Sequence, residues 1–87
     1  YPTREALAAD VVRILREAAA EQARRAAEVG VGAERRVQIL RMRFQEGLSN
    51  AEVAAALGVD PEFAQHQFAK ARRDFLPALH HVVAART

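Results

Sequence analysis

Residues 47–73, GLSNAEVAAALGVDPEFAQHQFAKARR, decide the fold of this chain. Ser49 is a good helix N-cap, and Glu52, three residues later, completes the sequence pattern of a capping box. Gly58 suits the end of a helix, because glycine adopts a left-handed backbone at little cost. The stretch therefore predicts a short helix over residues 50–57 that is closed by a tight turn.

A second helix is predicted directly after that turn. Asp60 is a good N-cap, and Pro61 fits the first turn of a helix, where its missing N–H would have no partner. An apolar stripe at helical spacing follows, formed by Ala64, Phe68, Ala71 and Phe75. Pro77 is expected to end or kink this helix near Phe75, with a short final helix over residues 77–84. Two helices joined by a short turn with glycine are typical of a helix-turn-helix.

The rest of the chain predicts two further helices. Residues 3–28 contain no proline or glycine and are rich in good helix formers, so they are expected to form one long helix of roughly 39 Å. A short connector over residues 30–32 precedes a predicted helix over residues 33–46. Its inward-facing residues are expected to be Val37, Leu40 and Phe44, with Ile39 and Met42 beside them. Residues 1–87 are thus predicted to form one small all-α domain, with the helix-turn-helix at 49–75 and a long N-terminal helix.

Composition narrows the class of protein. The chain has no cysteine, which leaves neither a disulfide framework nor a thiolate metal site. No apolar run approaches the length of a membrane span and no signal peptide is visible, so a cytoplasmic location away from membranes is expected. The net charge is +2; residues 1–30 carry five basic and five acidic groups, whereas residues 31–87 carry eight basic and six acidic groups. The positive excess therefore lies with the helix-turn-helix.

No catalytic, cofactor or metal site is predicted. The only serine, Ser49, is already explained as a cap, and the adjacent His80 and His81 would point about 100° apart on a helix. Neither of them stands at a metal-ligand spacing from His66. There is also no glycine-rich phosphate loop. We therefore expect a binding module and not an enzyme.

Residues 37–59 read V-x-x-L-R-x-R-F-x-E-G-L-S-N-A-E-V-A-x-x-L-G-V, and A-K-A-R-R follows at residues 69–73. From Val37 to Leu76, about half of the chain, this pattern resembles region four of bacterial sigma factors, the domain that reads the upstream promoter element. The resemblance implies a helix-turn-helix that binds double-stranded promoter DNA and contacts RNA polymerase. The effector domains of LuxR-type regulators share G-L-S-N-x-E-V-A and are the second choice, which would imply a dimer on a two-fold site.

In the DNA-binding interpretation, the second helix of the helix-turn-helix offers its exposed row to a groove. The residues predicted to read base edges are Glu62, Phe63, Gln65 and His66. The residues predicted to hold phosphates are Arg41, Arg43, Lys70 and Arg73. Glutamine matches the paired donor and acceptor of adenine, and glutamate accepts from the amino group of cytosine. For Arg41 and Arg43, an ordinary solvated helix surface is an equal alternative.

Two features leave other interpretations open. Gln65 and Gln67 stand where the sigma-factor family often has positive charges, which favours a protein-interaction module that keeps the fold and has lost DNA affinity. The long N-terminal helix has a wide apolar face and balanced charge. It is therefore expected either to pack within the chain or to bind a second copy of the chain or a regulator.

Overall fold

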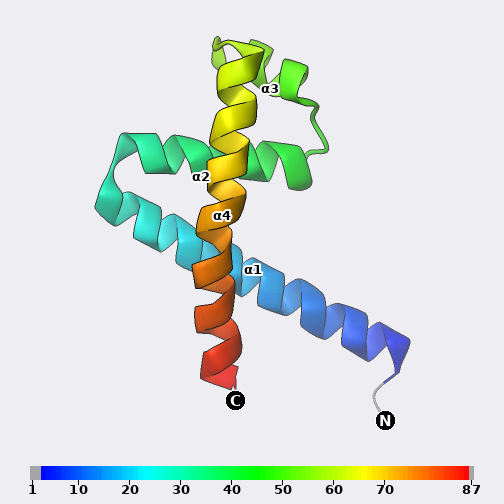
Figure 1. Ribbon diagram of the computed structural model, residues 1–87. Coiled ribbons are helices and arrows are strands. Elements are labelled where there is room, and N and C mark those ends of the chain that lie inside the picture. Colours follow the sequence, from blue (N-terminus) through cyan, green and yellow to red (C-terminus); the bar gives the residue numbers. More distant parts are fainter. Residues whose placement is uncertain (1–2, 87) are drawn as a thin grey trace.

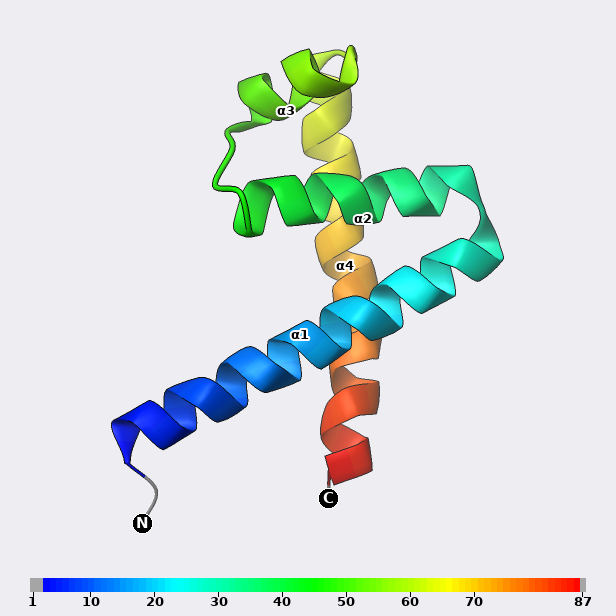
Figure 2. The same ribbon diagram turned by 180° about the vertical axis from the view of Figure 1, so that it is seen from behind.

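The computed structural model describes residues 3–86. The helices in this range are α1 (Arg4–Val29), α2 (Val31–Phe44), α3 (Asn50–Leu57) and α4 (Pro61–Arg86). No strand occurs among the described residues, so the predicted all-α class is confirmed. Helices α1 and α2 lie on one side of α4 and both cross it, while α3 lies beside the N-terminal end of α4 (Figures 1 and 2). The radius of gyration is 14.4 Å, against about 12 Å for a compact domain of this length, because α1 extends well beyond α4.

The break between α1 and α2 is shorter than the sequence predicts. Gly30 alone separates the two helices, with a φ of 136° that side chains other than glycine rarely allow. Val31 already begins α2. The predicted connector over residues 30–32 is therefore too long, and α2 begins and ends two residues earlier than predicted.

The side of α2 that faces the core also differs from the prediction. Ile39 is fully buried, whereas Val37 and Leu40 are half-buried. The predicted inward position of Phe44 is wrong, since this residue is 67% exposed at the last position of α2. The core cluster around Ile39 is completed by Met42, Val53, Ala54 and Ala64. Ile39 and Met42, which the pattern placed beside the predicted inward row, therefore form the buried side of α2, because α3 and α4 cover that side.

The predicted boundaries and caps of α3 are confirmed. The hydroxyl of Ser49 accepts from the backbone N–H of Glu52 at 3.1 Å, and the backbone N–H of Ser49 donates to Glu52 Oε1 at 3.1 Å. The Ser49 backbone N–H, and after it the Ser49 hydroxyl, lower the pKa of Glu52 because both favour its charged form. Gly58 ends the helix in the left-handed conformation, with φ 67° and ψ 35°. Local chemistry therefore accounts for this helix.

Helix α4 is one continuous helix where the sequence predicts two. It passes through Pro77 without ending (Figure 1), so the predicted end near Phe75 and the separate helix over residues 77–84 are wrong. An internal proline removes one helical hydrogen bond and costs about 3 kcal/mol or more. Burial against α1 on both sides of the proline offsets this cost. The buried residues concerned are Ala71, Ala78 and Val82.

Helices α1 and α4 cross through small side chains and one buried amide. The buried residues of α1 are Ala18, Gln22 and Ala26. Nε2 of Gln22 donates to the carbonyl oxygen of Ala71 in α4 at 2.9 Å, while its Oε1 is buried without a hydrogen-bond partner. Alanines on both helices let the backbones approach closely enough for this hydrogen bond. The position of the crossing is therefore set by a contact between residues 49 positions apart.

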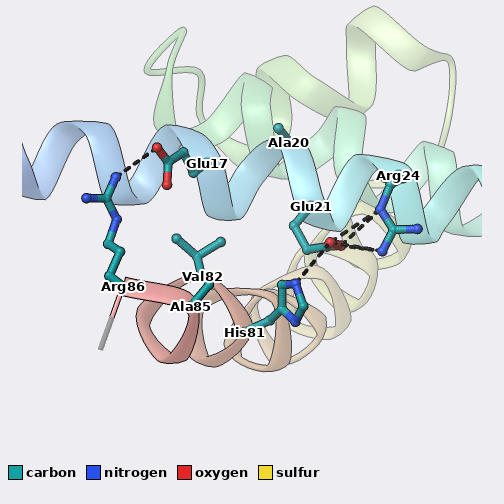
Figure 3. Close-up of a pocket in the computed structure, with 8 residues that line it drawn as sticks. All are labelled: Glu17, Ala20, Glu21, Arg24, His81, Val82, Ala85 and Arg86. Carbon is teal, nitrogen blue, oxygen red and sulfur yellow. Dashed lines mark hydrogen bonds and ion pairs between the residues drawn. The ribbon is translucent and has the colours of Figure 1, made fainter.

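A cluster of charged side chains borders the crossing (Figure 3). Glu21 in α1, whose side chain is 10% exposed, lies 2.6 Å from Arg24 and 3.8 Å from His81 of α4. Near the end of α4, Arg86 lies 2.8 Å from Glu17 of α1. The Arg86–Glu17 ion pair and the contact of His81 with Glu21 join the C-terminal half of α4 to the middle of α1.

Glu21 is expected to make the stability of the fold depend on pH. Its pKa lies below the usual 4.5, chiefly because Arg24 donates hydrogen bonds to the carboxylate. A group with a lower pKa in the folded chain stabilises the fold above its unfolded pKa, and this contribution is lost as the pH falls through the folded value. Glu21→Gln should therefore lower the melting temperature at neutral pH, and the difference from the parent should shrink and disappear as the pH falls below 4.5 and through the lowered folded pKa of Glu21.

Thermal unfolding followed by circular dichroism across this pH range measures the effect. Glu28→Gln is the matched control, because it removes an exposed carboxylate that lies 3.1 Å from the same Arg24. This control should change the melting temperature much less at every pH, since exposed ion pairs contribute little. If the melting temperature of Glu21→Gln stays equally far below that of the parent at the lowest pH, the role assigned to the carboxylate is wrong.

Candidate nucleic-acid interface

The first half of α4 presents a row of exposed polar side chains on the side opposite the core. Asp60 caps this end of the helix, since its Oδ1 accepts from the backbone N–H of Glu62 at 2.8 Å. The fully buried Ala64 fixes which side faces inward. Glu62, His66 and Arg73 follow one another at helical spacing on the outer side, and Glu62 lies 3.9 Å from His66. This row is accessible along its whole length.

Phe63 and Gln65 flank the row on opposite sides, because residues two apart on a helix point about 200° apart. Both are exposed, Phe63 by 40%. Lys70 is seven residues after Phe63 and lies exposed on the same side. The four residues predicted to read bases therefore occupy one arc of α4, with Glu62 and His66 at its centre.

Arg43, one of the predicted phosphate contacts, supports the fold in this structure. Its Nη1 donates to the carbonyl oxygen of Leu48 at 2.7 Å, and its guanidinium lies 4.9 Å from the centre of the Phe68 ring. These contacts join the end of α2 to the loop before α3 and to α4. Arg43 is half-buried, and its Nε is buried without a hydrogen-bond partner. The structure therefore assigns Arg43 an internal role.

Arg41 points to a different side of α2 from Arg43, again because the two are two residues apart on a helix. Arg41 is exposed and borders a shallow surface between α1 and α2, together with residues of α1 such as Ala23 and Ala27. Arg43 reaches toward α4 instead. The structure therefore does not bring Arg41 together with the exposed row of α4.

Arg72 is a basic residue that the sequence interpretation left out. It is exposed, and its guanidinium lies 5.0 Å from the centre of the Phe68 ring. Arg72 is seven residues after Gln65 and so lies on the Gln65 side of the row. This seven-residue spacing was visible in the sequence and could have identified Arg72 as a further candidate phosphate contact. With Lys70 and Arg73, Arg72 makes three cations beside the predicted base-reading arc.

The described residues, 3–86, contain no group of three histidine or acidic side chains that could hold a metal ion. None of the helices in this range is long and apolar enough to cross a membrane. Comparisons with protein-family models, with curated proteins and with solved structures found no match to this chain. Its function is therefore inferred from its own residues and geometry.

Proposed function

We propose that this chain is a sequence-specific DNA-binding module of a transcription initiation factor, in which α3 and α4 act as a helix-turn-helix. The observation that carries this proposal is the exposed arc on the first half of α4, where amide, carboxylate and imidazole groups lie beside three cations. A helix with such an arc fits the major groove of double-stranded DNA. The resemblance of residues 37–76 to sigma-factor region four supports the same role and adds RNA polymerase as the protein partner.

The geometry divides the proposed contacts into two kinds. Glu62, Gln65 and His66 face base edges, because they lie at the centre and on one flank of the exposed arc. The phosphate contacts come from α4 itself and are Lys70, Arg72 and Arg73. In this arrangement Arg43 orients α4 through its contacts with the Leu48 carbonyl and the Phe68 ring.

A protein-interaction module is the second candidate, and the internal role of Arg43 favours it. With Arg43 engaged and Arg41 on another side of α2, the predicted phosphate contacts that remain beside the arc, Lys70 and Arg73, both belong to α4. A net charge of +2 attracts the negatively charged DNA only weakly. Exposed Phe44 and Phe63 would instead offer apolar contacts to a protein partner.

The salt dependence of DNA binding separates the two candidates. Three phosphate contacts predict that log affinity falls with log salt at a slope of roughly −2.7. Arg73→Ala should weaken binding to all duplexes alike and flatten the slope by about 0.9. Gln65→Ala carries no change in charge, so the slope should hold while the preference at one base pair relaxes by about 1–3 kcal/mol. Fluorescence anisotropy with random and promoter-like duplexes measures both quantities.

Arg35→Ala is the matched control, because it removes the same charge from an exposed position on α2. Circular dichroism should first show that every variant is folded. If Arg35→Ala and Arg73→Ala weaken binding equally, the attraction is a general charge effect and α4 has no special role. If the parent chain binds no duplex even at low salt, the protein-interaction module becomes the better proposal.

A further inference from the structure

Glu62 and His66 form a pair of complementary groups at the centre of the exposed arc on α4. Nε2 of His66 lies 3.9 Å from Oε1 of Glu62, and the side chains of His66 and Glu62 are 71% and 83% exposed. This distance is too long for a hydrogen bond between the two side chains. The imidazole can therefore donate, and the carboxylate can accept, a hydrogen bond to a ligand of the arc.

The charged groups around His66 come from α4 itself. Glu62 is the one acidic group within ion-pair distance of His66 in residues 3–86, and Lys70 and Arg73 follow His66 by four and seven residues on the same side. Helices α2 and α3 cover the opposite side of this half of α4. Their charged groups have other partners or border other helices: Glu52 is bound by Ser49, Arg43 by the Leu48 carbonyl and Arg36 by Asp74, while Glu34, Arg35 and Arg41 border α1.

A G·C base pair presents the matching arrangement in the major groove. Guanine offers N7 and O6 as acceptors, and cytosine offers its N4 amino group as a donor. O6 and N4 are joined by a base-pair hydrogen bond and so lie about 3 Å apart. A donor and an acceptor that are 3.9 Å apart on the protein can therefore meet both bases of one pair.

An A·T base pair fits the same two side chains less well. Its amino group, N6 of adenine, lies between two acceptors, N7 of adenine and O4 of thymine. A carboxylate that accepts from N6 is therefore close to an acceptor on either side, which repels it. In the G·C pair both acceptors lie on one side of the amino group, so the positive and negative ends of the protein pair each meet their complement.

We propose that Glu62 and protonated His66 together read one G·C base pair, and that DNA binding is accompanied by uptake of a proton at His66; this rests on the DNA-binding function proposed above. The carboxylate of Glu62 accepts from the cytosine amino group, and Nε2 of His66 donates to O6 or N7 of guanine. With a neutral imidazole the pair carries a net negative charge, which the phosphates repel. With a protonated imidazole the pair is neutral, and its donors face only acceptors.

The affinity for DNA should then depend on pH. Histidine side chains in general titrate near about pH 6.5, and a protonation that accompanies binding strengthens binding as the pH falls through this range. At constant salt, the affinity for a duplex with the G·C pair should rise about tenfold between about pH 8 and about pH 6. Fluorescence anisotropy measures this rise, with duplexes that the parent chain selects from a randomised pool at about pH 6.

Two histidine variants assign the proton. His66→Gln keeps a polar side chain that cannot take up a proton at these pH values, so it should lose the tenfold rise. His80→Gln is the matched control, because it removes an exposed histidine from the second half of the same helix and should keep the rise. Both positions are exposed, so circular dichroism should show an unchanged fold.

Single base-pair replacements in the selected duplex test whether the two side chains act as one unit. The parent should prefer G·C over A·T about tenfold at one position. His66→Gln and Glu62→Gln should each relax the preference at this same position, and the double variant should relax it no further than the stronger single variant. Gln65→Ala is the control, because it should relax a different position and leave the pH dependence intact.

The outcomes separate this contact from the proposed function. A parent chain that binds no duplex at either pH would overturn DNA binding and this contact together. A parent chain whose affinity is independent of pH, or a His66→Gln variant that keeps the pH dependence, would overturn the contact and leave DNA binding in place. So would His66→Gln and Glu62→Gln variants that relax two different positions of the duplex.

Discussion

Ile39→Ala is expected to lower the free energy of unfolding by about 3–4 kcal/mol. Ile39 is fully buried and lies in the cluster where α2, α3 and α4 meet. Truncation removes its contacts and leaves a cavity among Met42, Val53 and Ala64, which sit on three different helices and cannot close the space without moving. Because small domains are stable by only about 5–15 kcal/mol, this is a large share of the total.

Urea unfolding of the parent and the variant measures this loss. Val31→Ala is the matched control, since Val31 lies on the same helix and is 79% exposed. The control should change stability by no more than about 0.5 kcal/mol. An Ile39→Ala variant as stable as the control would show that α2 does not pack through Ile39 in solution.

Ala71→Leu is expected to destabilise the fold by about 2–4 kcal/mol through the opposite mechanism, overpacking. Ala71 is fully buried where α1 crosses α4, and its carbonyl accepts from Gln22 at 2.9 Å. A leucine there pushes α1 away from α4. The buried amide of Gln22 then loses its hydrogen bond as well, and an unsatisfied buried polar group adds its own penalty.

Ala84→Leu adds the same atoms to an exposed position on the same helix and should have little effect. Thermal unfolding compares the two variants directly. The double variant Ala71→Leu with Gln22→Ala gives a sharper test, because shortening Gln22 makes room for the leucine. Its stability should exceed that expected from adding the two single losses. Additive losses would mean that Ala71 and Gln22 do not share one packing site.

The two halves of α4 contact different parts of the chain. The first half carries the exposed polar arc around Glu62 and His66, and its inner side packs on α2 and α3. The second half packs on α1 through Ala78 and Val82. Pro77 lies between these halves, and the helix continues through it. One rigid helix therefore couples the position of the exposed polar arc, proposed to contact DNA, to the position of α1.

The sequence by itself determined the parts of this fold that depend on near neighbours. The helix over residues 50–57 and its caps at Ser49 and Gly58 follow from side chains within three residues of each helix end. The long first helix follows from residues that all favour the same conformation. The exposed arc on α4 was also predictable, because the buried Ala64 and the helical period together fix its direction.

Only the tertiary structure decided the features that depend on partners far along the chain. Local rules end a helix at Pro77, yet α4 continues because buried residues on both sides of it pack on α1. The internal role of Arg43 depends on the distant ring of Phe68. The burial of Gln22 depends on a carbonyl 49 residues away. Sequence periodicity shows which side chains share a helix face, but the helices that cross that face, and how far they cover it, decide which of those side chains are buried.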